Sequence, residues 1–167
     1  MINDFRFELT FKNTFQLENK LNFCVSNNIN KINIPCKGVI KKDFLNETIK
    51  YIGENYKNLD VIYHYSLYHQ YTKNREYSYL EFLNFIKKCK FYKNKEILLV
   101  SGSNKKKKFE VLDVLKDYKN EKNLNINIGV AYNPYLKNHY NICGERERIK
   151  KKFSSRLTKS ILSLIHI

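Results

Sequence analysis

Five apolar segments recur along the chain, and a stretch with helical spacing separates each from the next. The segments are Phe5–Phe11, Lys31–Cys36, Asp60–Leu67, Glu96–Gly102 and Asn125–Asn133. Strands that alternate with helices are typical of a parallel sheet joined by crossover helices. In such folds the functional residues gather at the carboxyl ends of the strands. Those ends carry polar side chains here: Glu8, Thr10, His64, Ser66, Ser101, Ser103 and Asn133.

The spacing between the strands predicts the helices and their ends. Ser78 precedes the clearest helical stripe and is predicted to cap it. Two further helices are expected over 109–122 and 145–157. In the last strand, Ile128 and Val130 are expected to face the helices, and Ala131 the opposite side.

The number of units favours the N-terminal part of a (β/α)₈ TIM-type barrel, with five β-α units and the start of a sixth strand. A closed barrel needs eight units and typically about 250 residues, and the chain has 167. An open doubly wound sheet could be complete at this length. The first strand is not followed by the G-x-G-x-x-G turn of the dinucleotide-binding version of that fold.

The last six residues bear on where the domain ends. Leu162 to Ile167 is the peptide that CTG TCT CTT ATA CAC ATC encodes, and this string matches the end of a common sequencing adapter. We interpret 1–161 as a partial barrel domain and 162–167 as read-through, so the protein is expected to continue beyond Ile161. The alternative is an ordinary sixth strand. Sequencing the source locus past Ile161 decides between them.

Composition limits the classes of protein. The formal net charge is +15, yet Lys outnumbers Arg 26 to 5, and A- and T-rich codons account for such a bias. We therefore expect the Lys105–Lys108 run to be a solvated loop and expect no nucleic-acid partner, although a phosphate-bearing ligand could use that loop. The chain contains no apolar run long enough for a membrane span and no apparent secretory signal. The four cysteines lack metal-ligand spacing, which predicts reduced thiols, a cytoplasmic protein and no metal site.

Several strand-end segments, in order, resemble methylenetetrahydrofolate reductase, a flavin-dependent (β/α)₈ barrel. Phe7–Phe11 is similar to the family's first strand, Phe-Glu-Phe-Phe-Pro-Pro, and Tyr63–Ser66 to Ala-His-Leu-Thr. Ile97–Ser103 resembles Ile-Leu-Ala-Leu-Arg-Gly-Asp, and Ile128–Pro134 resembles Ile-Gly-Val-Ala-Gly-Tyr-Pro, the best single match. Arg148–Phe153 is similar to the family's Leu-Lys-x-Lys helix segment.

The resemblance implies an oxidoreductase that uses FAD and NAD(P)H to reduce a one-carbon unit bound to folate. Glu8 would be the general acid that protonates the folate. The cofactor-binding positions would be His64, Ser101, Gly102, Ser103, Ala131 and Asn133. The double proline that follows the family's first strand is absent here. Three further positions depart from the family pattern: Ser101 replaces an arginine, Ser103 the fourth-strand aspartate and Asn133 a tyrosine.

The residues leave other interpretations open. Glu8 could instead pair with Arg6 or a lysine, and His64 could be a hydrogen-bonded residue of the barrel interior. The loss of the acid at Ser103 favours a catalytically inactive relative that acts as a binding or regulatory module, whereas Glu8 and His64 favour the enzyme. A basic RNA-associated protein is a third class, and a homo-oligomer is compatible with each.

Overall fold

The computed structural model describes residues 5–36, 42–101, 109–121, 124, 126–132, 139–154 and 158–163. It contains one sheet with the strands β1 (Phe7–Glu8), β2 (Lys31–Ile34), β3 (Asp60–Ser66), β4 (Glu96–Val100), β5 (Asn127–Tyr132) and β6 (Thr158–Ser163). The helices are α1 (Thr14–Ser26), α2 (Lys42–Asn55), α3 (Leu67–Gln70), α4 (Arg75–Phe91), α5 (Val111–Tyr118) and α6 (His139–Ser154).

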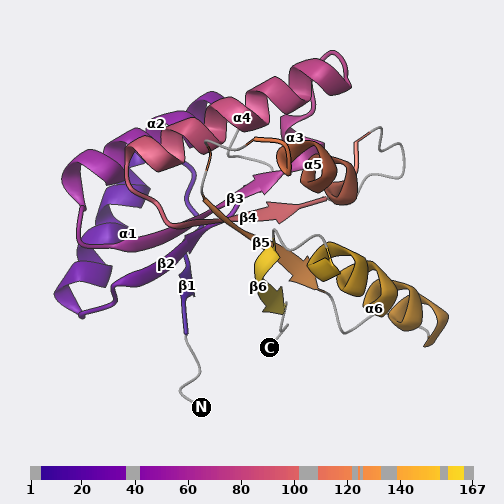
Figure 1. The fold of residues 1–167 in the computed structure, drawn as a ribbon. Coiled ribbons are helices and arrows are strands. Elements are labelled where there is room, and N and C mark those ends of the chain that lie inside the picture. The colour runs from indigo at the N-terminus through magenta and orange to yellow at the C-terminus, as the bar shows by residue number, and fades with distance from the viewer. Residues whose placement is uncertain are drawn as a thin grey trace.

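The strands lie in the order β1-β2-β3-β4-β5-β6, and every neighbouring pair is parallel. Crossover connections between parallel strands are right-handed. Because each crossover advances to the next strand in the same direction, the connecting helices lie on the same side of the sheet, and Figure 1 shows α2 and α4 stacked above it. A doubly wound sheet reverses its strand order at a switch point. The sequential order therefore excludes that alternative for the described strands.

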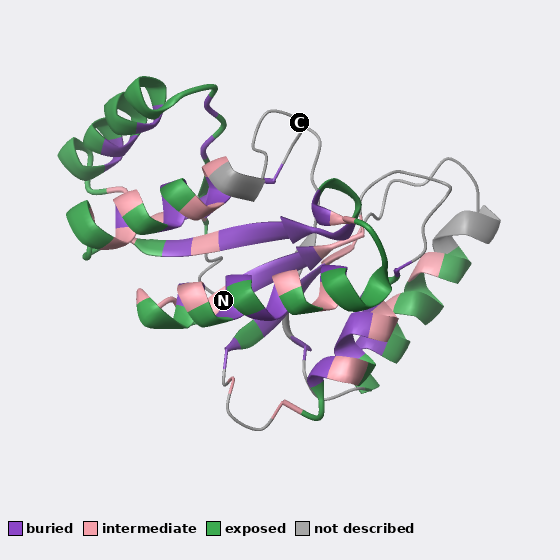
Figure 2. Cartoon of the chain, turned by 90° about the horizontal axis from the view of Figure 1, so that it is seen from above, coloured by how far each residue is buried: buried purple, intermediate pink, exposed green. Residues whose placement is uncertain are grey.

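The core lies between the sheet and these helices. Ile32, Ile34, Tyr63 and Tyr65 are buried on the helix side, and Tyr65 packs against Phe82 of α4 with ring centroids 5.2 Å apart. Figure 2 shows that the strands are buried over most of their length, whereas the helices alternate between buried and exposed residues. This is the distribution expected where a helix contributes one apolar stripe to a core.

The strands are shorter than the sequence pattern predicts. The alternation over Phe5–Phe11 produces only a two-residue β1, in which Phe7 remains 53% exposed. Leu9 and Phe11, from the same alternating face, are buried after the strand has ended. β2 ends at Ile34, before Pro35, which has no N–H to donate to a neighbouring strand.

The predicted cap of α4 is wrong by four residues. Asn74 is the N-cap, and its side-chain oxygen accepts a hydrogen bond from the Tyr77 amide at 2.8 Å. Ser78 instead lies in the first turns and is buried, where its hydroxyl oxygen accepts from the Thr72 amide at 3.0 Å. Both residue types can cap a helix, so the pattern did not distinguish them.

The C-terminal elements also differ in their bounds from the prediction. α5 covers Val111–Tyr118 and not 109–122, and α6 begins at His139 rather than at 145. β6 pairs with β5 and includes Leu162 and Ser163, the first two residues of the segment interpreted as read-through. An apolar segment can form such a strand whether it is natural sequence or adapter read-through, so the pairing does not distinguish the two interpretations.

None of the four cysteines forms a disulfide bond. Cys24, Cys36 and Cys89 are buried, and burial raises the pKa of each thiol, whereas Cys143 is exposed. Because the thiolate is the reactive form, we expect only Cys143 to react rapidly with a disulfide reagent at mildly alkaline pH. The other three should react once urea unfolds the chain. Cys143→Ser should abolish the rapid phase, and a rapid phase of two or more thiols would contradict the described packing.

Within the described residues, no helix combines the length and the apolarity that crossing a membrane requires.

Candidate functional site

The face of the sheet that points away from the helices, here called the inner face, carries the candidate site. The strand register places Glu8 beside Asn33, His64 beside Leu98, and Leu98 beside Gly129. Side chains alternate along a strand, so the residues between these positions face the helices. The core membership of Tyr63, Tyr65, Leu99 and Val130 agrees with that assignment.

Polar side chains are buried on this face. Asn33 is 4% exposed and His64 is 6% exposed. Among the described residues, no donor reaches the buried side-chain oxygen of Asn33. A buried acceptor that makes no hydrogen bond costs roughly 1–3 kcal/mol of folding free energy. A buried acceptor without a donor calls for an explanation, and a ligand contact is one, because Asn33 shares this face with Glu8 and His64.

The carboxyl edge of the inner face is held by short contacts between β3, α3 and β4. Ser66 ends β3 and caps α3, with its side-chain oxygen 3.4 Å from the His69 amide nitrogen. The Tyr68 amide in turn donates to the Ser101 carbonyl at 3.2 Å. These bonds keep the start of the loop after β4 next to the end of β3, close to His64.

Glu8 and Arg6 both belong to the N-terminal strand segment, but they have different surroundings. Glu8 is exposed at the carboxyl end of β1. The Arg6 guanidinium forms an ion pair with Asp60 and also donates to the Asp60 carbonyl at 3.0 Å. It thus ties the segment to the amino end of β3, across β2.

Four predicted site residues lie in the described part of the chain. Glu8 and His64 hold inner-face positions, Ser101 directly follows β4, and Ala131 is half-buried near the end of β5. Gly102, Ser103 and Asn133 lie outside the described residues. Together the four mark one edge of the sheet, from β1 to β5.

The prediction did not include Asn33 and did not give a role to Ser66. Both are buried, at 4% and 1% exposure. The alternation in Lys31–Ile34 could have placed Asn33 on the polar face, because its neighbours Ile32 and Ile34 are apolar. Its burial depends on the neighbouring strands, and no pattern within one segment reports that.

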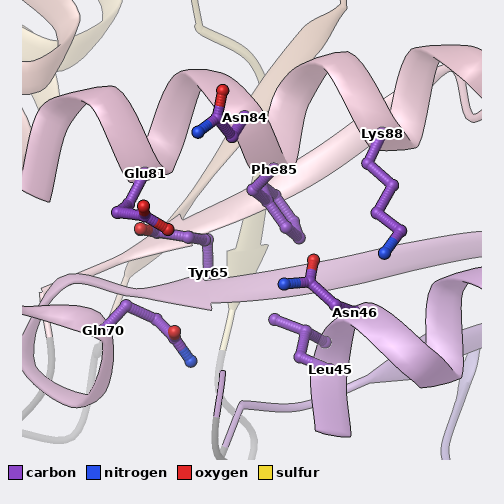
Figure 3. Close-up of a pocket in the computed structure, with 8 residues that line it drawn as sticks. All are labelled: Leu45, Asn46, Tyr65, Gln70, Glu81, Asn84, Phe85 and Lys88. Carbon is purple, nitrogen blue, oxygen red and sulfur yellow. The ribbon is translucent and has the colours of Figure 1, made fainter. Parts of the chain in front are cut away.

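A small pocket of about 210 Å³ lies on the opposite side of the sheet, between α2 and α4. Figure 3 shows the Tyr65 hydroxyl next to the Glu81 carboxylate, while the Lys88 side chain extends toward Asn46. Burial raises the pKa of Tyr65, and the charge of Glu81 raises it further. Gln70, in the pocket wall, lies 3.2 Å from the sulfur of Cys36. Ligand pockets usually enclose about 300–1,000 Å³, so this one is too small for a dinucleotide.

The described residues contain no group of three or more histidine, cysteine or carboxylate side chains that could hold a metal ion. The inner face carries a buried amide oxygen, an imidazole, the glycine Gly129 beside Leu98, and Ala131 two residues further along β5. These groups can bind a flat heterocycle through one polar edge, with the rest of the ring lying on apolar residues such as Leu98.

No protein-family model matches the chain, and no curated protein matches it.

Proposed function

We propose that the chain is part of a (β/α)₈ barrel flavoprotein that reduces a folate-bound one-carbon unit with NAD(P)H. The observation that carries the proposal is the sequential parallel order of six strands with Glu8, Asn33, His64 and Ala131 on one face. A sheet that adds each strand to the same edge has the order of a barrel. Of the segments that resemble methylenetetrahydrofolate reductase, Tyr63–Ser66 ends β3, and barrel enzymes hold their ligands at the carboxyl ends of the strands.

The inner face suits the isoalloxazine ring of FAD. Its buried Asn33 oxygen, which no donor among the described residues reaches, can accept a hydrogen bond from the ring's N–H. Gly129 and Ala131 place no large side chain above β5, and His64 lies beside Leu98 on the same face. When bound, FAD supplies hydride transfer between the nicotinamide and the folate.

Glu8 is the residue proposed to act on the folate. It ends β1 on the inner face and is exposed, so that a substrate at this edge can reach its carboxyl group. Its role is to hold a proton and deliver it to the folate, which makes the one-carbon unit electrophilic. Arg6, two residues before Glu8, forms its ion pair with Asp60 at the amino end of β3.

Asn33→Leu tests the cofactor site. Leucine fills a similar volume and removes the buried oxygen, so we expect the free energy of unfolding to rise by about 1 kcal/mol. The same change should weaken FAD binding about tenfold, because one hydrogen bond to the ring is lost. Urea unfolding and a titration that follows flavin fluorescence measure the two effects on the protein expressed from its full reading frame.

Asn127→Leu is the matched control. Asn127 lies beside Glu96 at the amino end of the same face and is exposed. The Asn127→Leu substitution should leave the affinity for FAD unchanged. A protein that takes up no FAD would overturn the proposed activity and favour the binding-module alternative, whereas equal affinities of the Asn33 variant and the parent protein would remove Asn33 from the site.

A further inference from the structure

A second cavity, larger than the pocket between α2 and α4, lies at the amino ends of β3 and β4, at the opposite end of the sheet from the candidate site. It has a volume of about 780 Å³, within the usual range for ligand pockets. Its wall combines the last turn of α2, the following loop to β3, and the loop from α4 to β4. Nothing in the proposed flavin chemistry uses this end of the sheet.

Aromatic rings form one part of this wall. Phe91 is 77% exposed at the end of α4, and the ring of Tyr92 meets it edge to face, with centroids 4.9 Å apart. Gly53 of α2 makes room for Tyr92, because a Cβ at Gly53 would overlap the tyrosine ring. The exposed face of Phe91 beside a cavity can stack with the ring of a ligand.

Three lysines, Lys57, Lys93 and Lys95, form a cationic part of the wall. Of the two carboxylates of the wall, Asp60 forms an ion pair with Arg6, and Glu54 accepts a hydrogen bond at 3.4 Å from the hydroxyl of Tyr92, another wall residue. Within the described part of the chain, none of the three lysines forms an ion pair with a carboxylate. The cavity therefore favours an anion.

Lys93 has an unusual backbone. Its φ of 61° lies in the left-handed region that favours glycine. The turn is held by the Lys93 amide bonded to the Lys90 carbonyl at 2.9 Å and by the Asn94 amide bonded to the Cys89 carbonyl at 2.9 Å. A lysine here stores strain that a glycine would relieve, at a position where its charge reaches the cavity.

Asn94 adds a directional group. Its side-chain nitrogen donates to the Val61 carbonyl at 3.3 Å, which fixes the amide. Its oxygen is buried, and no donor among the described residues reaches it. Since the oxygen can only accept, the group that would satisfy it must carry an N–H or O–H.

We propose that this cavity binds an adenine mononucleotide. The base would stack on Phe91, its exocyclic amino group would donate to the Asn94 oxygen, and its phosphate would lie among Lys57, Lys93 and Lys95. Each part of the ligand would contact a separate feature of the wall: an exposed ring, an acceptor that no donor of the described residues reaches, and lysines that pair with no carboxylate among those residues. Because it occupies the other end of the sheet, this site stands independently of the proposed flavin function.

Calorimetric titration of the full chain with AMP, IMP and adenosine, at physiological ionic strength and without flavin, tests the ligand class. IMP carries an oxygen in place of the amino group, so we expect it to bind about tenfold more weakly than AMP. Adenosine lacks the phosphate and should also bind more weakly. Equal affinity for AMP and IMP, or no saturable binding of AMP at millimolar concentration, would overturn the proposal. Tight binding of single-stranded RNA without binding of AMP would overturn it too.

Two substitutions by glycine locate the site and separate an effect on AMP affinity from an effect on stability. Lys93→Gly and Lys73→Gly both replace a lysine with positive φ, at 61° and 39°, and only Lys93 lines the cavity. Both should raise the urea concentration at the unfolding midpoint. Only Lys93→Gly should weaken AMP binding, by about three- to tenfold. An equal effect of the two on AMP affinity, or none from either, would place the nucleotide elsewhere.

Phe91→Ala tests the stacking contact separately. Because the ring is exposed, its removal should change stability little, while AMP affinity should fall about tenfold. An unchanged affinity would remove the stacking contact and with it the proposed pose.

Discussion

Glu8→Gln should lower the rate of folate reduction by about 10²-fold or more while FAD affinity stays nearly unchanged. Glutamine keeps the shape and hydrogen-bonding capacity of glutamate but cannot deliver a proton, and losing a general acid typically costs a factor of this size. Glu8 is exposed at the end of β1, so the change removes no buried contact. The measurement is the steady-state rate of NADH consumption with methylenetetrahydrofolate, on the protein expressed from its full reading frame.

Oxidation of NADH by the FAD-loaded variant without folate provides the internal control. This half of the reaction requires no acid from the protein, so its rate should match that of the parent protein. Unchanged folate reduction in Glu8→Gln, or loss of the fold, would show that Glu8 has a structural role. In that case the family role does not apply to this chain.

Phe82→Ala should reduce the free energy of unfolding by about 3–5 kcal/mol, as expected for a large aromatic removed from a packed core. Phe82 is fully buried and contacts the rings of Tyr65 and Tyr118, at centroid distances of 5.2 and 6.0 Å. It therefore joins β3, α4 and α5 through one side chain. Because small domains are stable by only about 5–15 kcal/mol, much of the chain's stability would be lost.

Leu80→Ala on the same helix is the control. Leu80 is 57% exposed, so its truncation should change the free energy of unfolding by less than about 0.5 kcal/mol. Urea unfolding followed by circular dichroism measures both variants. Similar losses in the two would mean that α4 packs on the sheet through a different face.

The alternation of strands and helices predicted the fold class and the parallel sheet, because hydrophobic periodicity is a local property. The face assignment of β5 is confirmed: Ile128 and Val130 are fully buried against the helices. The lengths of the strands were harder to predict. Phe5 and Phe7 alternate as strand residues should, yet they stay 78% and 53% exposed. A strand needs a partner along its whole length, and the pattern of one segment does not show where its partner ends.

Some residues of the candidate site could be predicted from the sequence, and others could not. His64 and Glu8 were predicted from their places in their strands, and both hold inner-face positions. Asn33 and Asn94 were not identified, because a buried oxygen without a donor is a property of several segments packed together. The engagement of Arg6 with Asp60, 54 residues away, depends on tertiary structure for the same reason.

The central claim is that FAD lies on the inner face at the carboxyl ends of the strands, within a closed barrel. A crystal structure of the protein, expressed from its full reading frame and saturated with FAD, tests this most directly. The account predicts an eight-stranded barrel with the isoalloxazine ring over Gly129 and Ala131 and its N–H directed at the Asn33 oxygen. An open sheet, or FAD bound at the amino ends of β3 and β4 beside Phe91 and Asn94, would contradict it.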